Sequence, residues 1–233
     1  MFVGHFGAAF AAKRAAPRVL LGTLFLSFQF ADLLWPVLLI VGVEHVRAAP
    51  GLMPTNPYDF YDYPISHSLT ALTLWGALFG AAHWFRRRDT RAAIVLAAGV
   101  VSHWFLDALM HRPDVPVFPR GPYVGLGLWR SVFLTVAIEG SLYAAGIAMY
   151  LSSTRPKDRT GTWSLWALVA FLGAGWASSV GTMKAVDAGK LAWGALALWL
   201  VVPWGYWIDR HRTARAGRSR QSIGDVVIAP PAP

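Results

Sequence analysis

The chain has 233 residues, of which 55% are hydrophobic and only 14% are charged. A water-soluble domain of this length could not bury so much apolar surface in one core, so the composition predicts a protein embedded in a lipid bilayer. The net charge of +9 fits attraction to anionic lipid, and nucleic acid is not expected as a partner because no aromatic-basic motif interrupts the apolar runs. The absence of cysteine excludes disulfide bonds and cysteine-ligated zinc.

Six stretches are long and apolar enough to cross a bilayer, which takes about 20 residues of helix. We therefore predict an all-α fold, a polytopic transmembrane helix bundle of about six spans that occupies residues 1–209. The predicted spans are residues 19–43, 65–85, 92–110, 131–151, 163–183 and 191–208. The remainder, residues 210–233, is basic and ends in Pro and Ala, which predicts a disordered cytoplasmic tail.

The distribution of basic residues orients these spans. If the N-terminus lies inside, 15 of the 21 Lys and Arg residues fall on the cytoplasmic side and 6 fall outside. Both ends of the chain are therefore expected in the cytoplasm. The two long outer connections are residues 47–64, rich in Pro, Tyr and Asp, and residues 112–130, rich in Pro, Gly and Arg.

Five ionisable side chains lie inside predicted spans, where each costs about 2.5–3.5 kcal/mol to insert and therefore needs a partner or a function. They are Asp32, His67, His103, Asp107 and Glu139. Counted from the nearest cytoplasmic arginine at about 1.5 Å per residue, their depths are ~21, ~28, ~18, ~24 and ~24 Å. Four different spans thus place them at one level in the outer half of the membrane, which predicts that they converge on one site.

The chemistry of this set suits a metal ion. His103 and Asp107 are four residues apart and project from one face of a helix. With His67 and Asp32 they offer two imidazoles and two carboxylates, which suit Zn²⁺ or, alternatively, Mn²⁺ or Fe²⁺. A bound ion would also neutralise the two buried aspartates. For any one of these residues alone, a pair with a neighbouring helix or a place in a proton path is an alternative.

Two further histidines lie near this level. The segment from Phe2 to Lys13 is too short to span, and His5 reaches only ~12 Å above Lys13 if the segment is a helix. It is either an amphipathic surface helix or a re-entrant segment that ends near the site. His111 lies ~12 Å beyond His103 along the helix axis, which predicts a residue at the mouth of the site.

The order of these residues resembles that of the YdjM-type inner-membrane metal-dependent hydrolases, a family also described as LexA-binding hydrolases. The resemblance covers about residues 1–140 and implies a location in a bacterial inner membrane. The matching motifs are Gly4-His5-Phe6-Gly7, Ala31-Asp32, His67-Ser68, Ser102-His103-Trp104-Phe105-Leu106-Asp107 and the Pro-rich run 114–119.

More distantly, the same order is similar to that of zinc-dependent phospholipase C and the S1/P1-type nucleases. That resemblance implies one zinc ion held by Asp32, His67, His103 and Asp107, and it implies that His5 is a ligand of a further metal. The chain departs from both patterns. Residues 33–36 replace the second Asp and the His that YdjM-type proteins commonly have there, and the later His ligands and HxxxE pair of the phospholipases are missing, which argues against a full multi-zinc cluster.

The predicted function is a membrane-bound, metal-dependent hydrolase that acts on a phosphoester such as a phospholipid headgroup, with membrane lipid as its partner. Glu139 is the candidate general base, or else a residue that orients a ligand histidine. Arg112, Arg120 and Arg130 are candidates to bind the phosphate, or else ordinary interfacial arginines. The alternatives are a transporter or channel with an intramembrane polar site, and a non-catalytic protein with a structural metal.

Overall fold

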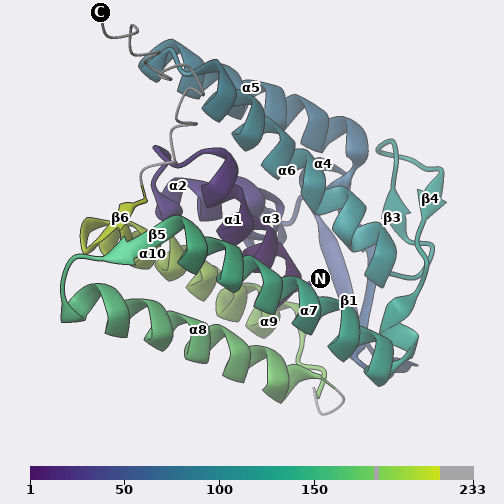
Figure 1. The fold of residues 1–233 in the computed structure, drawn as a ribbon. Coiled ribbons are helices and arrows are strands. Elements are labelled where there is room, and N and C mark those ends of the chain that lie inside the picture. Colours follow the sequence, from purple (N-terminus) through teal and green to yellow (C-terminus); the bar gives the residue numbers. More distant parts are fainter. Residues whose placement is uncertain (181–183, 216–233) are drawn as a thin grey trace, which may run out of the picture.

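The computed structural model describes residues 1–180 and 184–215, and the predicted tail beyond residue 215 lies outside them. Its long helices lie side by side between two ends of the molecule (Figure 1). They are α5 (Leu69–Arg87), α6 (Thr90–Met110), α7 (Val132–Ser153) and α8 (Arg159–Ser179). A further pass is divided into α9 (Ala188–Ala195), the 3-10 helix η2 (Leu196–Leu200) and α10 (Val201–Arg210).

The first predicted span is bent. Its two halves, α2 (Leu21–Phe28) and α3 (Phe30–Ile40), meet at Gln29 at an angle of 58°. In the described part of the chain, three segments are long and apolar enough to cross a membrane, namely residues 90–110, 132–153 and 188–210, and the bent pair would be a fourth. The helices α5 and α8 have sufficient length but are less apolar. The prediction of a helical membrane protein is confirmed in this coarser form, and the count of six spans stays a prediction.

Three short antiparallel sheets accompany the helices, so the fold is mostly rather than purely α-helical. The predicted outer loop 47–64 is a hairpin of β1 (His45–Met53) and β2 (Asn56–Asp62). In the second outer loop, β3 (Val115–Pro116) pairs with β4 (Tyr123–Val124), and at the opposite end β5 (Thr154–Pro156) pairs with β6 (Arg212–Ala214). Strand pairing satisfies backbone N–H and C=O groups where prolines prevent a helix from continuing.

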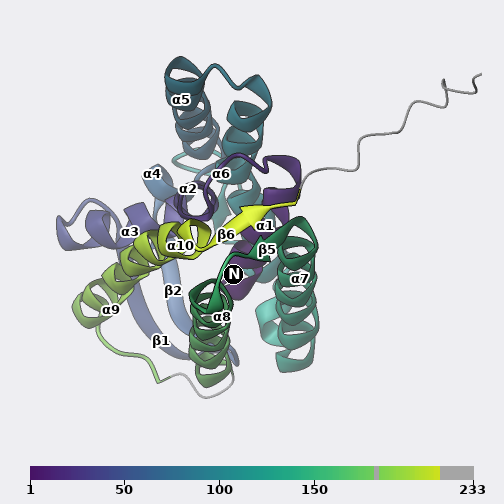
Figure 2. The same ribbon diagram turned by 60° about the vertical axis from the view of Figure 1, so that its left-hand side comes forward.

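The N-terminal helix α1 (Val3–Ala15) lies inside the molecule, surrounded by α2, α6, α7 and α8 (Figures 1 and 2). Its side chains at Val3, Phe6 and Phe10 are fully buried. The backbones of α1 and α7 approach so closely that a side chain at Gly146 would overlap the carbonyl oxygen of Gly7. The alternative of an amphipathic surface helix is therefore wrong, because every residue of α1 except Arg14 is buried or partly buried. The first turn of α1 places His5 against His103 at the predicted site.

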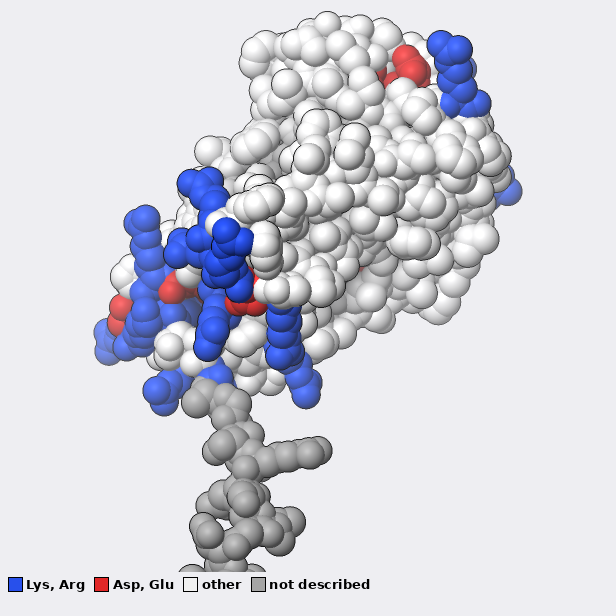
Figure 3. All heavy atoms as spheres, turned by 90° about the horizontal axis from the view of Figure 1, so that it is seen from above, with Lys and Arg blue, Asp and Glu red and all other residues white. Residues whose placement is uncertain are grey.

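Most of the basic side chains visible in Figure 3 gather at one end of the molecule. This end holds the turn between α5 and α6 and the β5–β6 pair. Inside it, the ammonium group of Lys13 donates to the Asp209 carboxylate at 2.5 Å, and the Tyr150 hydroxyl donates to the same carboxylate at 2.7 Å. The buried lysine is thus paired with a carboxylate, as a charge in an apolar interior requires.

The close approach of α1 and α7 can be tested at Gly146. We expect Gly146→Ala to destabilise the protein by about 1–3 kcal/mol, which corresponds to a loss of several degrees in Tm, because the added methyl group forces the two backbones apart. Thermal unfolding in detergent measures the effect. The matched control is Gly175→Ala in α8, where a Cβ would meet no atom within 4 Å. An unchanged Tm for the Gly146 variant would contradict the packing described here.

Candidate metal centre

Four side chains from three segments converge near the middle of the molecule. Asp32 lies on α3, His67 ends the short helix α4 (Pro64–His67), and α6 carries both His103 and Asp107. The His103 Nε2 atom is 3.3 Å from Asp107 Oδ2 and 3.6 Å from Asp32 Oδ1. The His67 Nε2 atom is 3.8 Å and 3.5 Å from the same two oxygens. The structure thus brings together four of the five residues that the sequence places at one depth, and Glu139 does not contact these four.

These separations suit the ligand atoms of one divalent ion. In a tetrahedral zinc site with bonds of about 2.0–2.1 Å, neighbouring ligand atoms are about 3.3–3.4 Å apart. The four distances observed here range from 3.3 to 3.8 Å. His67, His103 and Asp107 are buried, whereas the Asp32 side chain keeps 20% of its surface exposed. The cluster is therefore most accessible at Asp32.

The hydrogen bond on the far side of His103 fixes its tautomer. Its Nδ1 atom is 3.0 Å from the Phe28 carbonyl oxygen, which can only accept, so Nδ1 carries the proton. The Nε2 atom faces two carboxylates and has no hydrogen-bond partner among the described residues, although it is buried. Three acceptors that face each other repel unless a proton or a metal ion lies between them.

A relay of hydrogen bonds orients His67 in the same way. The Ser66 hydroxyl lies 2.6 Å from His67 Nδ1 and donates to Glu44 at 2.5 Å. The second oxygen of Glu44 accepts the backbone N–H groups of Ile65 and Ser66 at 2.7 Å and 2.8 Å. Because the Ser66 hydroxyl donates its hydrogen bond to Glu44, it can only accept one from His67. The Nδ1 atom of His67 therefore carries a proton, and its Nε2 atom faces the cluster. Metal-ligating histidines in proteins almost always donate their other N–H in this manner.

Glu44 and Ser66 were missed by the sequence analysis. Glu44 comes directly after the first predicted span, and Ser66 directly precedes a candidate ligand. These positions were the signals that the sequence offered. The contact between Glu44 and Ser66 could not be predicted, because it forms only when the β1–β2 hairpin folds back and brings Ser66 to Glu44.

His5 belongs to a second group of potential metal ligands in the described residues, with His103 and Asp107, beside the group of Asp32, His67 and His103. Its ring stacks on that of His103, with centroids 3.6 Å apart and an angle of 8° between the rings. Its Nε2 atom is 3.1 Å from Asp107 Oδ1, the oxygen that faces away from His103, and the Met1 nitrogen lies 2.5 Å from the same oxygen. Asp107 therefore uses one oxygen toward His67 and His103 and the other toward α1. His5 Nδ1 is buried without a hydrogen-bond partner.

Glu139 on α7 lines a cavity that adjoins the four-residue cluster, but it does not contact the cluster. Its carboxylate accepts the Phe2 backbone N–H at 2.8 Å and the indole N–H of Trp129 at 3.4 Å. His111, which was predicted at the mouth of the site, also lines this cavity, and its Nε2 atom is 4.0 Å from Oδ1 of Asp107, one helical turn earlier.

The three arginines predicted to bind phosphate do not reach the cavity. Arg112 forms ion pairs with Asp59 on β2 and with Asp114, the latter at 3.0 Å. Arg120 and Arg130 are exposed and line no part of the cavity. Arg120 lies between the paired strands β3 and β4, and Arg130 follows them.

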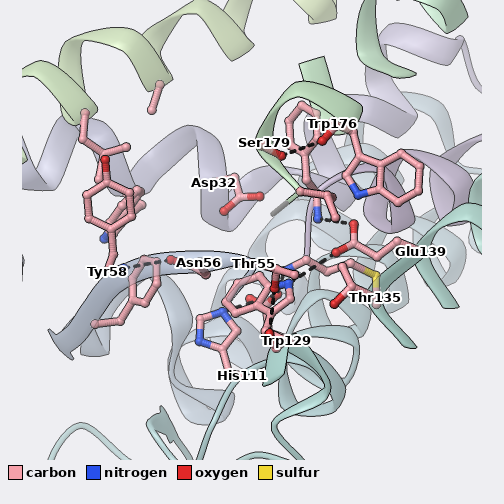
Figure 4. A pocket seen from close by; sticks show the side chains of 18 of the residues that line it. Asp32, Thr55, Asn56, Tyr58, His111, Trp129, Thr135, Glu139, Trp176 and Ser179 are labelled. Carbon is pink, nitrogen blue, oxygen red and sulfur yellow. Dashed lines mark hydrogen bonds and ion pairs between the residues drawn. The ribbon is translucent and has the colours of Figure 1, made fainter. Parts of the chain in front are cut away.

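A cavity of about 320 Å³ adjoins the cluster (Figure 4). Asp32, His67 and Asp107 line one part of it, and Glu139 faces it from α7. Aromatic and apolar side chains dominate the remaining wall, among them Trp35, Phe60, Tyr63, Trp129, Trp176, Leu191 and Leu198. Burial raises the pKa of the Tyr63 hydroxyl well above its usual value, so Tyr63 keeps its proton and donates to the Asp114 carbonyl at 3.2 Å. The space is thus polar where the cluster lies and apolar elsewhere.

The family model for YdjM inner membrane proteins matches residues 63–182, which is about half of the chain. This chain belongs to the YdjM inner membrane protein family. The matched region contains His67, His103, Asp107 and Glu139, whereas His5 and Asp32 precede it. No curated protein and no solved structure matches the chain. Membership in the YdjM family and the apolar helices together identify a membrane protein.

The lone pairs and carboxylates of the cluster lead us to expect that the purified protein binds about one divalent ion per chain, with zinc favoured. His103→Ala should abolish binding, and Glu44→Gln should weaken it about 10–100-fold because His67 loses its orienting relay. Elemental analysis and competition with a chelating dye measure both effects. The matched control is His45→Ala, since His45 is exposed and pairs with Asp62 on the hairpin.

Metal-free wild-type protein that takes up no zinc would contradict this assignment. So would equal loss of metal in the His45 and His103 variants, because the effect would then be unrelated to the cluster.

Proposed function

We propose that this YdjM-family protein is a metal-dependent hydrolase of the inner membrane that cleaves a phosphoester in an amphipathic, lipid-like substrate. The observation that carries the proposal is the position of the cluster: the Nε2 atoms of two histidines and two carboxylates face one another at the wall of a largely apolar cavity. A structural zinc site is usually closed by its four protein ligands, whereas a catalytic site keeps a position open to substrate.

Asp32 supplies the open side of the cluster. Its side chain is 20% exposed and lines the cavity, so a substrate oxygen or a water molecule can reach the place where the four groups meet. A divalent ion held there would supply Lewis-acid activation of water and of the phosphoryl oxygen. Asp107 is held on its other oxygen by His5, which keeps its orientation toward His67 and His103 fixed.

Glu139 is suited to receive a proton within the cavity. Its carboxylate is held from two sides by the Phe2 N–H and the Trp129 indole, so its position is defined without an ion pair to an arginine or lysine in the described chain. A fixed carboxylate in a largely apolar cavity is the usual setting for a general base. We assign this role to Glu139, across the cavity from Asp32 (Figure 4).

The walls of the cavity support an amphipathic substrate. Trp176 and Gly175 on α8 face Leu191, Ala195 and Leu198 of the α9–η2 segment across the space. Gly175 is exposed as well as cavity-lining, so the cavity reaches the surface between these helices. An apolar chain could leave by this route into lipid while the phosphoester stays at the cluster. Because the three outer-loop arginines lie elsewhere, the charge of the phosphate would be met at the cluster itself.

The proposed topology is six spans with both ends in the cytoplasm. Successive passes run in alternating directions between the basic end of the molecule and the end that carries the β1–β2 hairpin (Figure 1). These passes are α2–α3, α5, α6, α7, α8 and α9–α10. The excess of Lys and Arg at one end supports its assignment to the cytoplasmic side.

We expect reporter fusions after Arg215 and in the hairpin turn at Pro54 to lie on opposite sides of the membrane, with the fusion after Arg215 in the cytoplasm. Paired alkaline phosphatase and fluorescent-protein fusions measure this, and a fusion in the α5–α6 turn at Asp89 should match the one after Arg215. Fusions at Pro54 and Arg215 on the same side would contradict the odd number of passes between them.

The catalytic proposal is tested with Glu139→Gln. This change should lower the turnover of a phosphoester about 10²–10⁴-fold while metal content stays at the wild-type value, because Glu139 does not belong to the metal cluster. Fluorescent phospholipids and phosphomonoesters, assayed with parallel elemental analysis, measure it. The control is Ser179→Ala, a cavity residue whose hydroxyl donates to the Trp176 carbonyl, and it should leave turnover unchanged.

Metal-loaded wild-type protein that turns over no phosphoester would overturn the hydrolase proposal in favour of a structural metal. Equal losses in the Glu139 and Ser179 variants would overturn the assignment of Glu139 as the base.

A further inference from the structure

A second cleft, of about 860 Å³, lies at the basic end of the molecule and is separate from the metal centre. One wall is the connection between α1 and α2, with Arg18, Val19 and Leu20. The other wall is the end of α5 and the turn into α6, including Arg86 and Arg87. The cleft therefore joins two segments that lie more than sixty positions apart in the sequence.

The cleft carries an excess of positive charge that the described protein does not neutralise. Four arginines line it, Arg18, Arg86, Arg87 and Arg88, against a single carboxylate, that of Asp89. That carboxylate accepts the Ala92 N–H at the start of α6. Within residues 1–180 and 184–215, Arg18, Arg86 and Arg87 form no ion pair. Converging arginines without carboxylate partners favour an anion between them.

Arg88 shows how the turn holds these side chains. It ends α5 with a backbone φ of 54°, in the left-handed region that non-glycine residues rarely adopt. Its guanidinium lies over the Trp84 ring at 4.3 Å. This contact anchors the turn against the outer face of α5 and leaves Arg86 and Arg87 to face the cleft with Arg18.

The apolar part of the cleft indicates the kind of anion. Val19, Leu20, Phe79 and Ala82 line it, and Leu20 and the nearby Phe85 are 47% and 67% exposed. An arginine rim above apolar walls, at the end of a membrane bundle, matches a phosphate headgroup above acyl chains. We propose that this cleft binds the phosphate of an anionic phospholipid from the leaflet at the basic end, independently of the metal centre.

The test is native mass spectrometry of the full chain in detergent, titrated with phosphatidylglycerol, phosphatidylcholine or inorganic phosphate. We expect phosphatidylglycerol to bind more tightly than phosphatidylcholine, and each of Arg18→Gln, Arg86→Gln and Arg87→Gln to cost about fivefold in affinity. Inorganic phosphate alone should compete weakly, because it lacks the chains that contact the apolar wall. The matched controls are Arg155→Gln and Arg159→Gln, which remove exposed arginines at the same end but outside the cleft.

Equal losses in the control variants would overturn the proposal, because attraction to the whole basic end would then suffice. Inorganic phosphate that displaces phosphatidylglycerol at equal concentration would also overturn it in favour of a free-anion site. Unchanged metal content in the cleft variants would support the independence of the two sites, and a matching loss of metal would contradict it.

Discussion

The structure depends on an electrostatic conflict at the centre of the molecule. Two aspartates and two histidines meet there, and the Phe28 carbonyl and the Ser66–Glu44 pair hold the protons of both imidazoles on the far side. The Nε2 atoms of both imidazoles face the carboxylates across 3.3–3.8 Å. In an apolar interior such carboxylates require positive charge nearby, of which the Met1 nitrogen supplies a part at Asp107. A divalent ion would supply the remainder with the ligand types present.

The rest of the fold holds this arrangement in place. The bend between α2 and α3 places the Phe28 carbonyl at Nδ1 of His103 and Asp32 at Nε2 on the opposite edge of the same ring. The β1–β2 hairpin returns the chain so that Glu44 can reach Ser66, and α1 enters the bundle so that His5 stacks on His103. The cavity then opens beside the more exposed Asp32, which joins the cluster to an apolar route between α8 and the α9–η2 segment. The position of the cluster and its access from the cavity both support the proposed hydrolase.

The sequence predicted the features that follow from the length of apolar runs and the regular rise of a helix. Apolar runs placed the long helices within a few residues, and counting along them placed Asp32, His67, His103 and Asp107 at one depth. It left open the place of α1, because burial of so short a helix depends on the close contact of Gly7 with α7, which no local pattern encodes. It also missed Glu44, whose partner Ser66 lies beyond a hairpin. It predicted that Arg112 binds a phosphate, whereas the guanidinium of Arg112 forms ion pairs with Asp59 and Asp114.

The central claim is that these four side chains surround one metal ion. X-ray absorption spectroscopy of the zinc-loaded protein at the metal edge tests it most directly, because the spectrum reports the type of each ligand atom. The account predicts a first coordination shell of nitrogen and oxygen at about 2.0–2.1 Å with the outer-shell scattering of two imidazole rings, both lost in His103→Ala. A shell of six oxygen atoms without imidazole scattering, or a spectrum that His103→Ala leaves unchanged, would contradict it.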